Sequence, residues 1–250
     1  APMSLLSALL ATATLLAPVP PDPRVHSGKA GDLAVKPPLL TGEIVVDGTL
    51  DEGMWREASV LTGFSQFTPI DGVAASDSTE VLVWYSATAL HIGVRAHDAA
   101  GAVRSTLAER DRMFNDDNIQ IYLSTFNDGR QATFFAVNPL GVQGDGALNE
   151  SGRGSSCNGF NCATQTREGP DLSQDFVWQS KGRLTPTGYE VEIRIPFKSI
   201  RFQQAATQSW GINVLRVVQR SGQEQSWAPA KRASSSFLAQ SGRLEGLTDL

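Results

Sequence analysis

The chain has 250 residues, of which 41 % are hydrophobic and 19 % are charged. That length can bury one sizeable core, and β-sandwiches of this size often form a single domain. The formal net charge is -5 and Lys and Arg form no run, so the chain lacks the clustered basic surface that nucleic-acid binding requires. We therefore expect one main domain and no nucleic-acid partner.

Residues 3–17 are apolar and rich in small side chains. This stretch is shorter than the roughly 20 residues of a transmembrane helix and is typical of the central region of a secretory signal peptide. No Lys or Arg precedes it, and the alternative is a stray N-terminal helix. We predict a signal peptide at residues 1–20 and therefore an exported protein.

Residues 21–39 are rich in proline and glycine, a composition that predicts a linker because it buries little apolar area. The folded domain is then expected over residues 40–250. The two cysteines of the chain, Cys157 and Cys162, lie in a stretch rich in Gly and Ser. In an oxidising compartment they are expected to form a local disulfide, and two free thiols are the alternative.

From residue 42 onward, apolar and polar side chains alternate with a period of two, which predicts strands with one buried face. Two hairpins are expected, one from residues 80–85 and 90–97, the other from residues 118–123 and 131–137. Further strands are predicted at residues 176–184, 189–195 and 210–219, a long loop at 144–174, and short helices at 51–58 and 103–109. The pattern predicts an all-β fold, an antiparallel, jelly-roll-like β-sandwich with one or two short helices.

The most distinctive motif is IVVDGTLDEGMW at residues 44–55, read as a strand, an Asp-Gly turn and a helical turn that buries Trp55. With the segments TFND (125–128), FAVNPLGV (135–142) and YEVEIRIPF (189–197), it resembles family 9 carbohydrate-binding modules. The last three segments resemble, within that family, the subgroup found before a predicted bacterial outer-membrane β-barrel. The similarity covers about residues 40–247.

The resemblance implies a non-catalytic module that holds a glycan by aromatic stacking and hydrogen bonds. It also implies an envelope protein of carbohydrate catabolism, in the periplasm, outer membrane or cell surface of a bacterium, sometimes with structural calcium. An alternative hypothesis is a docking module that caps an outer-membrane β-barrel and binds no sugar. A weaker alternative is a part of a glycoside hydrolase whose activity resides in another domain.

Stacking on a sugar requires exposed aromatic faces. Trp84 is out of phase with the predicted core positions of its strand, so it would stand on the opposite face, unless a further layer covers it. Trp178 follows the predicted long loop and Trp227 lies in a polar stretch, whereas the other tryptophans are expected in the core. The predicted ligand-binding residues are Trp84, His91, Arg95, His97, Trp178 and Trp227.

Four carboxylates between residues 111 and 128 offer hard oxygen ligands for calcium. They are Asp111, Asp116, Asp117 and Asp128. Their spacing differs from that of an EF-hand, and the alternative is a solvated acidic loop or pairing with neighbouring arginines. With the family resemblance, we predict a calcium site at these residues.

Glu190 and Glu192 are paired acids on a predicted strand and therefore share one face. A glycosidase needs two carboxylates on either side of a cleft. A ladder of opposite charges across neighbouring strands explains this pair more simply. We therefore expect the chain to have no catalytic residues.

Overall fold

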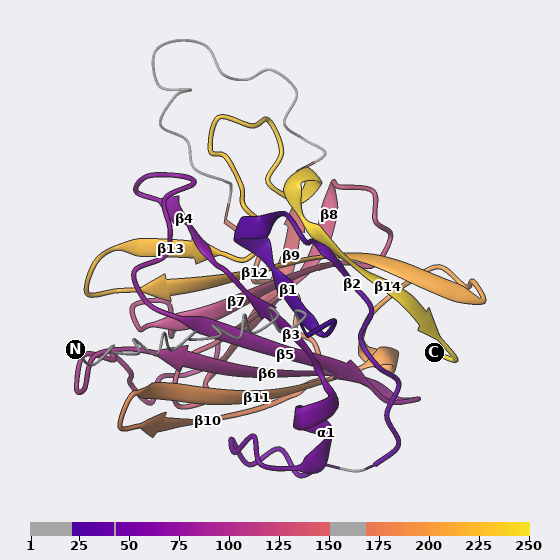
Figure 1. Cartoon of the computed structure of the whole chain (residues 1–250), viewed down its shortest axis with the longest axis horizontal. Helices are drawn as coiled ribbons and strands as arrows, with labels where there is room; N and C mark the ends of the chain where they lie inside the picture. Colours follow the sequence, from indigo (N-terminus) through magenta and orange to yellow (C-terminus); the bar gives the residue numbers. More distant parts are fainter. Residues whose placement is uncertain (1–21, 43, 151–168) are drawn as a thin grey trace, which may run out of the picture.

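The computed structural model describes residues 22–42, 44–150 and 169–250. Two β-sheets pack face to face (Figure 1), which confirms the predicted sandwich. The six-stranded sheet has the spatial order β1 (Val25–Ser27), β3 (Ser59–Thr62), β5 (Thr79–Tyr85), β6 (Ala89–His97), β11 (Gly188–Pro196) and β10 (Gln179–Thr185).

The eight-stranded sheet has the order β2 (Ala34–Val35), β14 (Gly242–Thr248), β12 (Thr207–Val218), β7 (Asn118–Ser124), β8 (Gln131–Val137) and β9 (Gln143–Asn149). β13 (Gln223–Ser226) pairs with β12 and with β4 (Ser65–Thr68). The helical pieces are α1 (Gly53–Glu57), η1 (Gly28–Ala30), η3 (Phe197–Ser199) and η4 (Leu238–Gln240). No helix in the described residues is long and apolar enough to span a membrane.

Both predicted hairpins are present. β5 pairs antiparallel with β6, from Thr79 opposite Ala96 to Tyr85 opposite Leu90. β7 pairs antiparallel with β8. The alternation in these strands gives each sheet one face of branched and aromatic residues, and the two faces meet in the main core.

The outward faces of both sheets are also covered by the chain itself. Leu82 and Trp84 point outward from β5 and pack against Leu50 and Trp55, which come from α1 and the segment before it. On the other sheet, the outward side chains of β7 and β8 pack beneath Phe67 of β4 and residues 237–238. The molecule therefore has a central core and two smaller apolar layers outside the sheets.

The described part of the predicted linker is not a linker. β1 pairs in parallel with β3, and β2 pairs in parallel with β14, so the segment joins the edges of both sheets. Gly28 packs directly on the backbone of Trp227, whose indole N–H donates to the carbonyl of His26 at 3.2 Å. The overall composition concealed this pairing, because β1 and β2 themselves contain no proline and so keep the backbone donors and acceptors that sheet pairing uses. The predicted signal peptide lies outside the described residues.

The short helix predicted at residues 51–58 is confirmed as α1, but residues 103–109 are not helical. The carboxylate of Asp117 accepts the backbone N–H of Arg104 at 3.0 Å, and that of Asp116 accepts the N–H of Thr106 at 2.8 Å. These bonds tie residues 104–106 to the residues that lead into β7, and residues 102–109 have no regular secondary structure.

The predicted loop over residues 144–174 is also wrong at its start, because residues 143–149 form β9 along β8. A β-carbon on Gly146 would lie 2.2 Å from the carbonyl oxygen of Asp171, so this strand needs glycine at a close backbone approach. The glycines of β9 interrupt the alternation of apolar and polar side chains, so that alternation did not predict this strand.

Candidate functional site

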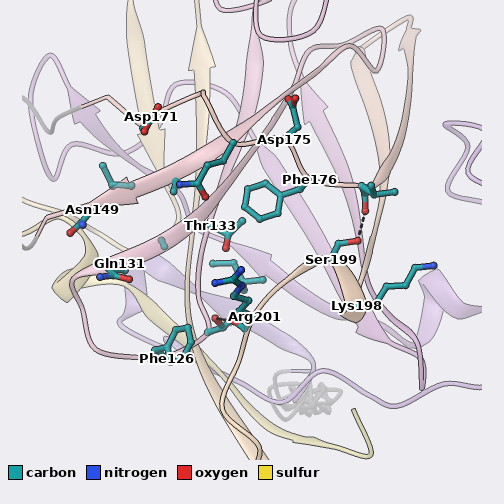
Figure 2. A pocket seen from close by; sticks show the side chains of 17 residues that line it. Phe126, Gln131, Thr133, Asn149, Asp171, Asp175, Phe176, Lys198, Ser199 and Arg201 are labelled. Carbon is teal, nitrogen blue, oxygen red and sulfur yellow. Dashed lines mark hydrogen bonds between the residues drawn. The ribbon is translucent and has the colours of Figure 1, made fainter.

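A cleft of about 1060 Å³ opens at the end of the sandwich where β7 passes into β8 (Figure 2). One wall is the inward face of β7, β8 and β9, represented by Leu123, Thr133 and Ala147. The other wall consists of residues 174–177, which precede β10, and residues 198–201, which follow β11. The volume is large enough for a small oligosaccharide, since ligand pockets typically measure about 300–1,000 Å³.

Two phenylalanine rings supply apolar surface in the cleft. Phe126 lies in the turn between β7 and β8, and its side chain is 47 % exposed. Phe176 is half-buried and packs edge to face on Phe135 with ring centres 5.7 Å apart. Phe135 in turn packs on Trp178 at 5.2 Å. The ring of Phe176 is thus held against the core while it faces the cleft (Figure 2).

Amide, hydroxyl and charged side chains surround these rings. The polar residues of the lining are Thr125, Gln131, Thr133, Asn149, Asp171, Gln174, Asp175, Lys198, Ser199 and Arg201. Such a set offers hydrogen-bond donors and acceptors beside an apolar face, which is the chemistry that a polyhydroxylated ring requires.

Hydrogen bonds hold the wall segments in place. The Ser199 hydroxyl donates to the carbonyl of Val177 at 2.6 Å, which ties the segment after β11 to the segment before β10 (Figure 2). The Thr125 hydroxyl donates to the carbonyl of Arg201, which ties the same segment to the end of β7. The cleft is therefore built from segments that are distant in sequence and fixed to one another.

The sequence matches the family described as "Carbohydrate family 9 binding domain-like" over residues 46–234, which is well over half of the chain. The chain belongs to this family. No curated protein sequence matches it significantly.

Solved structures of family 9 modules have a similar fold. A family 9 module from Caldicellulosiruptor kristjanssonii in complex with cellotriose has a TM-score of 0.55 at 14 % identity, over 86 % of this chain and 95 % of that chain. Its complex with glucose has a TM-score of 0.53 at 14 % identity, over 87 % and 98 %. A candidate carbohydrate-binding protein from Bacteroides uniformis has a TM-score of 0.60 at 11 % identity, over 85 % and 97 %. At these identities the likeness shows the fold alone.

The exposure predicted for Trp84 in this module is wrong. Its side chain is fully buried and lies edge to face with Trp55, with ring centres 5.9 Å apart. The imidazole of His91 stacks on the indole of Trp84 at 3.8 Å, with only 5° between the ring planes. The alternation placed Trp84 on the correct face, but α1 and residues 40–50 cover that face.

Three of the other predicted ligand residues are either paired with another side chain or buried in the core. Arg95 lies 3.4 Å from Glu190, and Trp178 and Trp227 are 6 % and 0 % exposed in the main core. His97 is exposed at the end of β6. The structure therefore does not bring the six predicted residues together, and Trp178 approaches the cleft only from behind, through Phe135.

The four aspartates of the predicted calcium site do not come together either. Asp116 and Asp117 are buried and bind the backbone of residues 104–106, while Asp111 accepts the N–H of Asp145 at 3.0 Å. Asp128 lies at the other end of β7, where it accepts the N–H groups of residues 130 and 131. Within the described ranges no group of three or more His, Cys, Asp and Glu side chains is arranged to hold a metal. Cys157 and Cys162 lie outside those ranges.

Glu190 and Glu192 do not line the cleft. Glu190 pairs with Arg183 at 2.6 Å and with Arg95, in the manner of a cross-strand charge ladder. Glu192 accepts the backbone N–H groups of Asp47 and Gly48 at 2.8 and 3.0 Å. Burial raises the pKa of Glu192 to about 7 against these two hydrogen bonds, and the nearby carboxylates of Glu52 and Asp47 raise it further.

The cleft residues Phe126, Phe176 and Arg201 were missed by reasoning from the sequence. Phe126 lies within the TFND segment, where a large aromatic side chain in a turn is a signal of exposure. Phe176 and Arg201 carry no comparable signal, because Phe176 precedes β10, Arg201 follows η3, and nothing in the sequence places the two near each other.

Proposed function

We propose that this family 9 module binds a glycan in the cleft between the sheet ends, without catalysing its cleavage. The main support for this proposal is the combination of two phenyl rings, Phe126 and Phe176, with a lining of amides, hydroxyls and charged groups. Relatives of the same fold are recorded in complexes with cellotriose and glucose. A flat pyranose face can rest on a phenyl ring while its hydroxyls bond to the polar lining.

The test is a glycan array followed by calorimetry on each ligand that binds. Phe126→Ala is expected to weaken binding at least tenfold and to leave the unfolding temperature nearly unchanged, because the side chain is half exposed. Leu107→Ala is the matched control, since Leu107 is 87 % exposed and outside the cleft. The proposal fails if no glycan binds, or if both variants bind equally well.

We also propose that the module works in the bacterial envelope, in a protein of carbohydrate catabolism that carries an outer-membrane β-barrel. The apolar stretch at residues 3–17 and the resemblance to barrel-associated modules support this context. Cell fractionation of the natural host and sequencing of the mature N-terminus would test it. An uncleaved protein in the cytoplasm would contradict it, whereas a module that joins a barrel and binds no glycan would favour the docking alternative.

A further inference from the structure

We propose that the cleft prefers acidic glycans, and that Arg201 recognises the carboxylate of a uronic acid. This inference rests on the proposed function, because it names the class of sugar for the same cleft. It follows from the charged side chains of the lining, which are Asp171, Asp175, Lys198 and Arg201.

Arg201 is the charged side chain that enters the cleft. Figure 2 shows its guanidinium pointing toward Thr133 and the ring of Phe176. Among the described residues, the Arg201 side chain has no carboxylate within ion-pair distance and no hydrogen-bond acceptor. The backbone carbonyl of Arg201 is held by the Thr125 hydroxyl, so the base of the side chain is fixed while its charge remains available.

The other three charges lie toward the rim. Lys198 points away from the centre of the cleft, and Asp171 and Asp175 lie along the opposite edge (Figure 2). Asp175 is also 3.5 Å from the guanidinium of Arg110 outside the lining, which offsets part of its charge. Of the charged side chains that the structure describes in the lining, Arg201 is therefore the one that lies nearest to a ligand in the middle of the cleft.

A guanidinium binds a carboxylate through two parallel hydrogen bonds, a geometry that a neutral hydroxymethyl group cannot reproduce. A uronic acid differs from its neutral hexose by this carboxylate in place of the hydroxymethyl group. With the ring against Phe176, the carboxylate can lie over Arg201 while the ring hydroxyls face the amides of the strand wall. The geometry points to uronate as the chemical feature that selects the ligand.

The experiment compares acidic and neutral members of the same array. The strongest uronate-containing ligand is then titrated by calorimetry beside its methyl ester, which keeps the ring and removes the charge. The acid is expected to bind at least about tenfold more tightly than the ester, since a hydrogen bond to a charged group contributes about 1.5–3 kcal/mol. Sulfated sugars on the array show whether any anion suffices, and binding to sulfated but not carboxylated sugars would overturn the carboxylate assignment.

Arg201→Gln is expected to abolish the preference for acid over ester and to change the affinity for the ester less than twofold. Arg112→Gln is the control, because Arg112 is exposed, lies outside the cleft and, within the described residues, pairs with Glu109. Neutral hits with no preference for acid would refute this inference and leave the proposed function standing. An array with no hits at all would refute the proposed function itself.

Discussion

Two buried ionisable groups on neighbouring strands are expected to give the module opposing dependences of stability on pH. His91 on β6 stacks on Trp84, and burial lowers its pKa to about 3, with a further contribution from the guanidinium of Arg194. Glu192 on β11 is fully buried with its pKa raised to about 7. Their usual values are 6.5 and 4.5, so both titrate differently in the folded and unfolded states.

The signs of the two effects are opposite. Between pH 3 and 6.5 the unfolded chain protonates His91 and the folded chain does not, so the free energy of unfolding rises with pH. Between pH 4.5 and 7 the folded chain protonates Glu192 and the unfolded chain does not, so the free energy of unfolding falls with pH. Each slope is about 1.4 kcal/mol per pH unit, and from pH 4.5 to 6.5 the two contributions cancel.

Single substitutions should reveal each slope separately. Glu192→Gln leaves the His91 contribution, and its unfolding free energy is expected to rise by about 2 kcal/mol from pH 4.5 to 6.5 relative to the wild type. His91→Gln leaves the Glu192 contribution and is expected to fall by about the same amount. Urea unfolding at pH 4.5, 5.5 and 6.5, followed by tryptophan fluorescence, measures all three curves.

His97→Gln is the control for this experiment, because His97 lies on the same strand but is exposed. Its curve should keep the shape of the wild-type curve. Parallel curves for Glu192→Gln, His91→Gln and the wild type would refute the coupling between burial and protonation at both sites.

Three further predictions concern stability and binding. Trp84→Ala should lower the unfolding free energy by about 3–5 kcal/mol, because it removes a buried aromatic side chain, and calorimetry at a temperature where the variant is folded should show unchanged glycan affinity. Asp98→Asn should cost about 3–5 kcal/mol in denaturant unfolding, since it leaves the buried guanidinium of Arg216, 3.1 Å away, without its counter-charge. Removal of residues 22–35 should lower the midpoint of thermal unfolding, measured by circular dichroism, because β1 and β2 join the edges of both sheets; an unchanged midpoint would restore the linker interpretation.

Alternation of side chains predicted β5, β6, β7, β8, β11 and β12, because each of these strands carries a run of branched or aromatic residues on its core face. The same signal could not find β1, β2 or β9. The first two are short and pair in parallel at the sheet edges, and β9 contains Gly144 and Gly146 where Phe114 and Asp171 approach the backbone. These three strands are held by backbone pairing and lack a run of apolar side chains, so alternation could not reveal them.

The ligand site was misplaced for a related reason. A period of two shows on which side of the sheet Trp84 points, but it does not show what lies over that side. The cover comes from α1 and from Leu50, some thirty residues earlier in the chain. Phe126, Phe176 and Arg201 meet only in the folded state, and no local pattern connects the turn after β7 with the segments on either side of β10 and β11.

The two outer apolar layers restrict where this module can present a ligand site. Leu82 and Trp84 on one sheet, and Tyr122 and Phe134 on the other, are buried beneath the chain itself, so these aromatic side chains offer no surface to a sugar. The sheet ends remain, and there the residues in turns and flanking segments contribute little to the core. Phe126 can therefore change with little loss of stability, whereas a change at Trp84 costs several kcal/mol, on the order of a buried aromatic side chain. Binding and stability should consequently respond to different substitutions in this molecule.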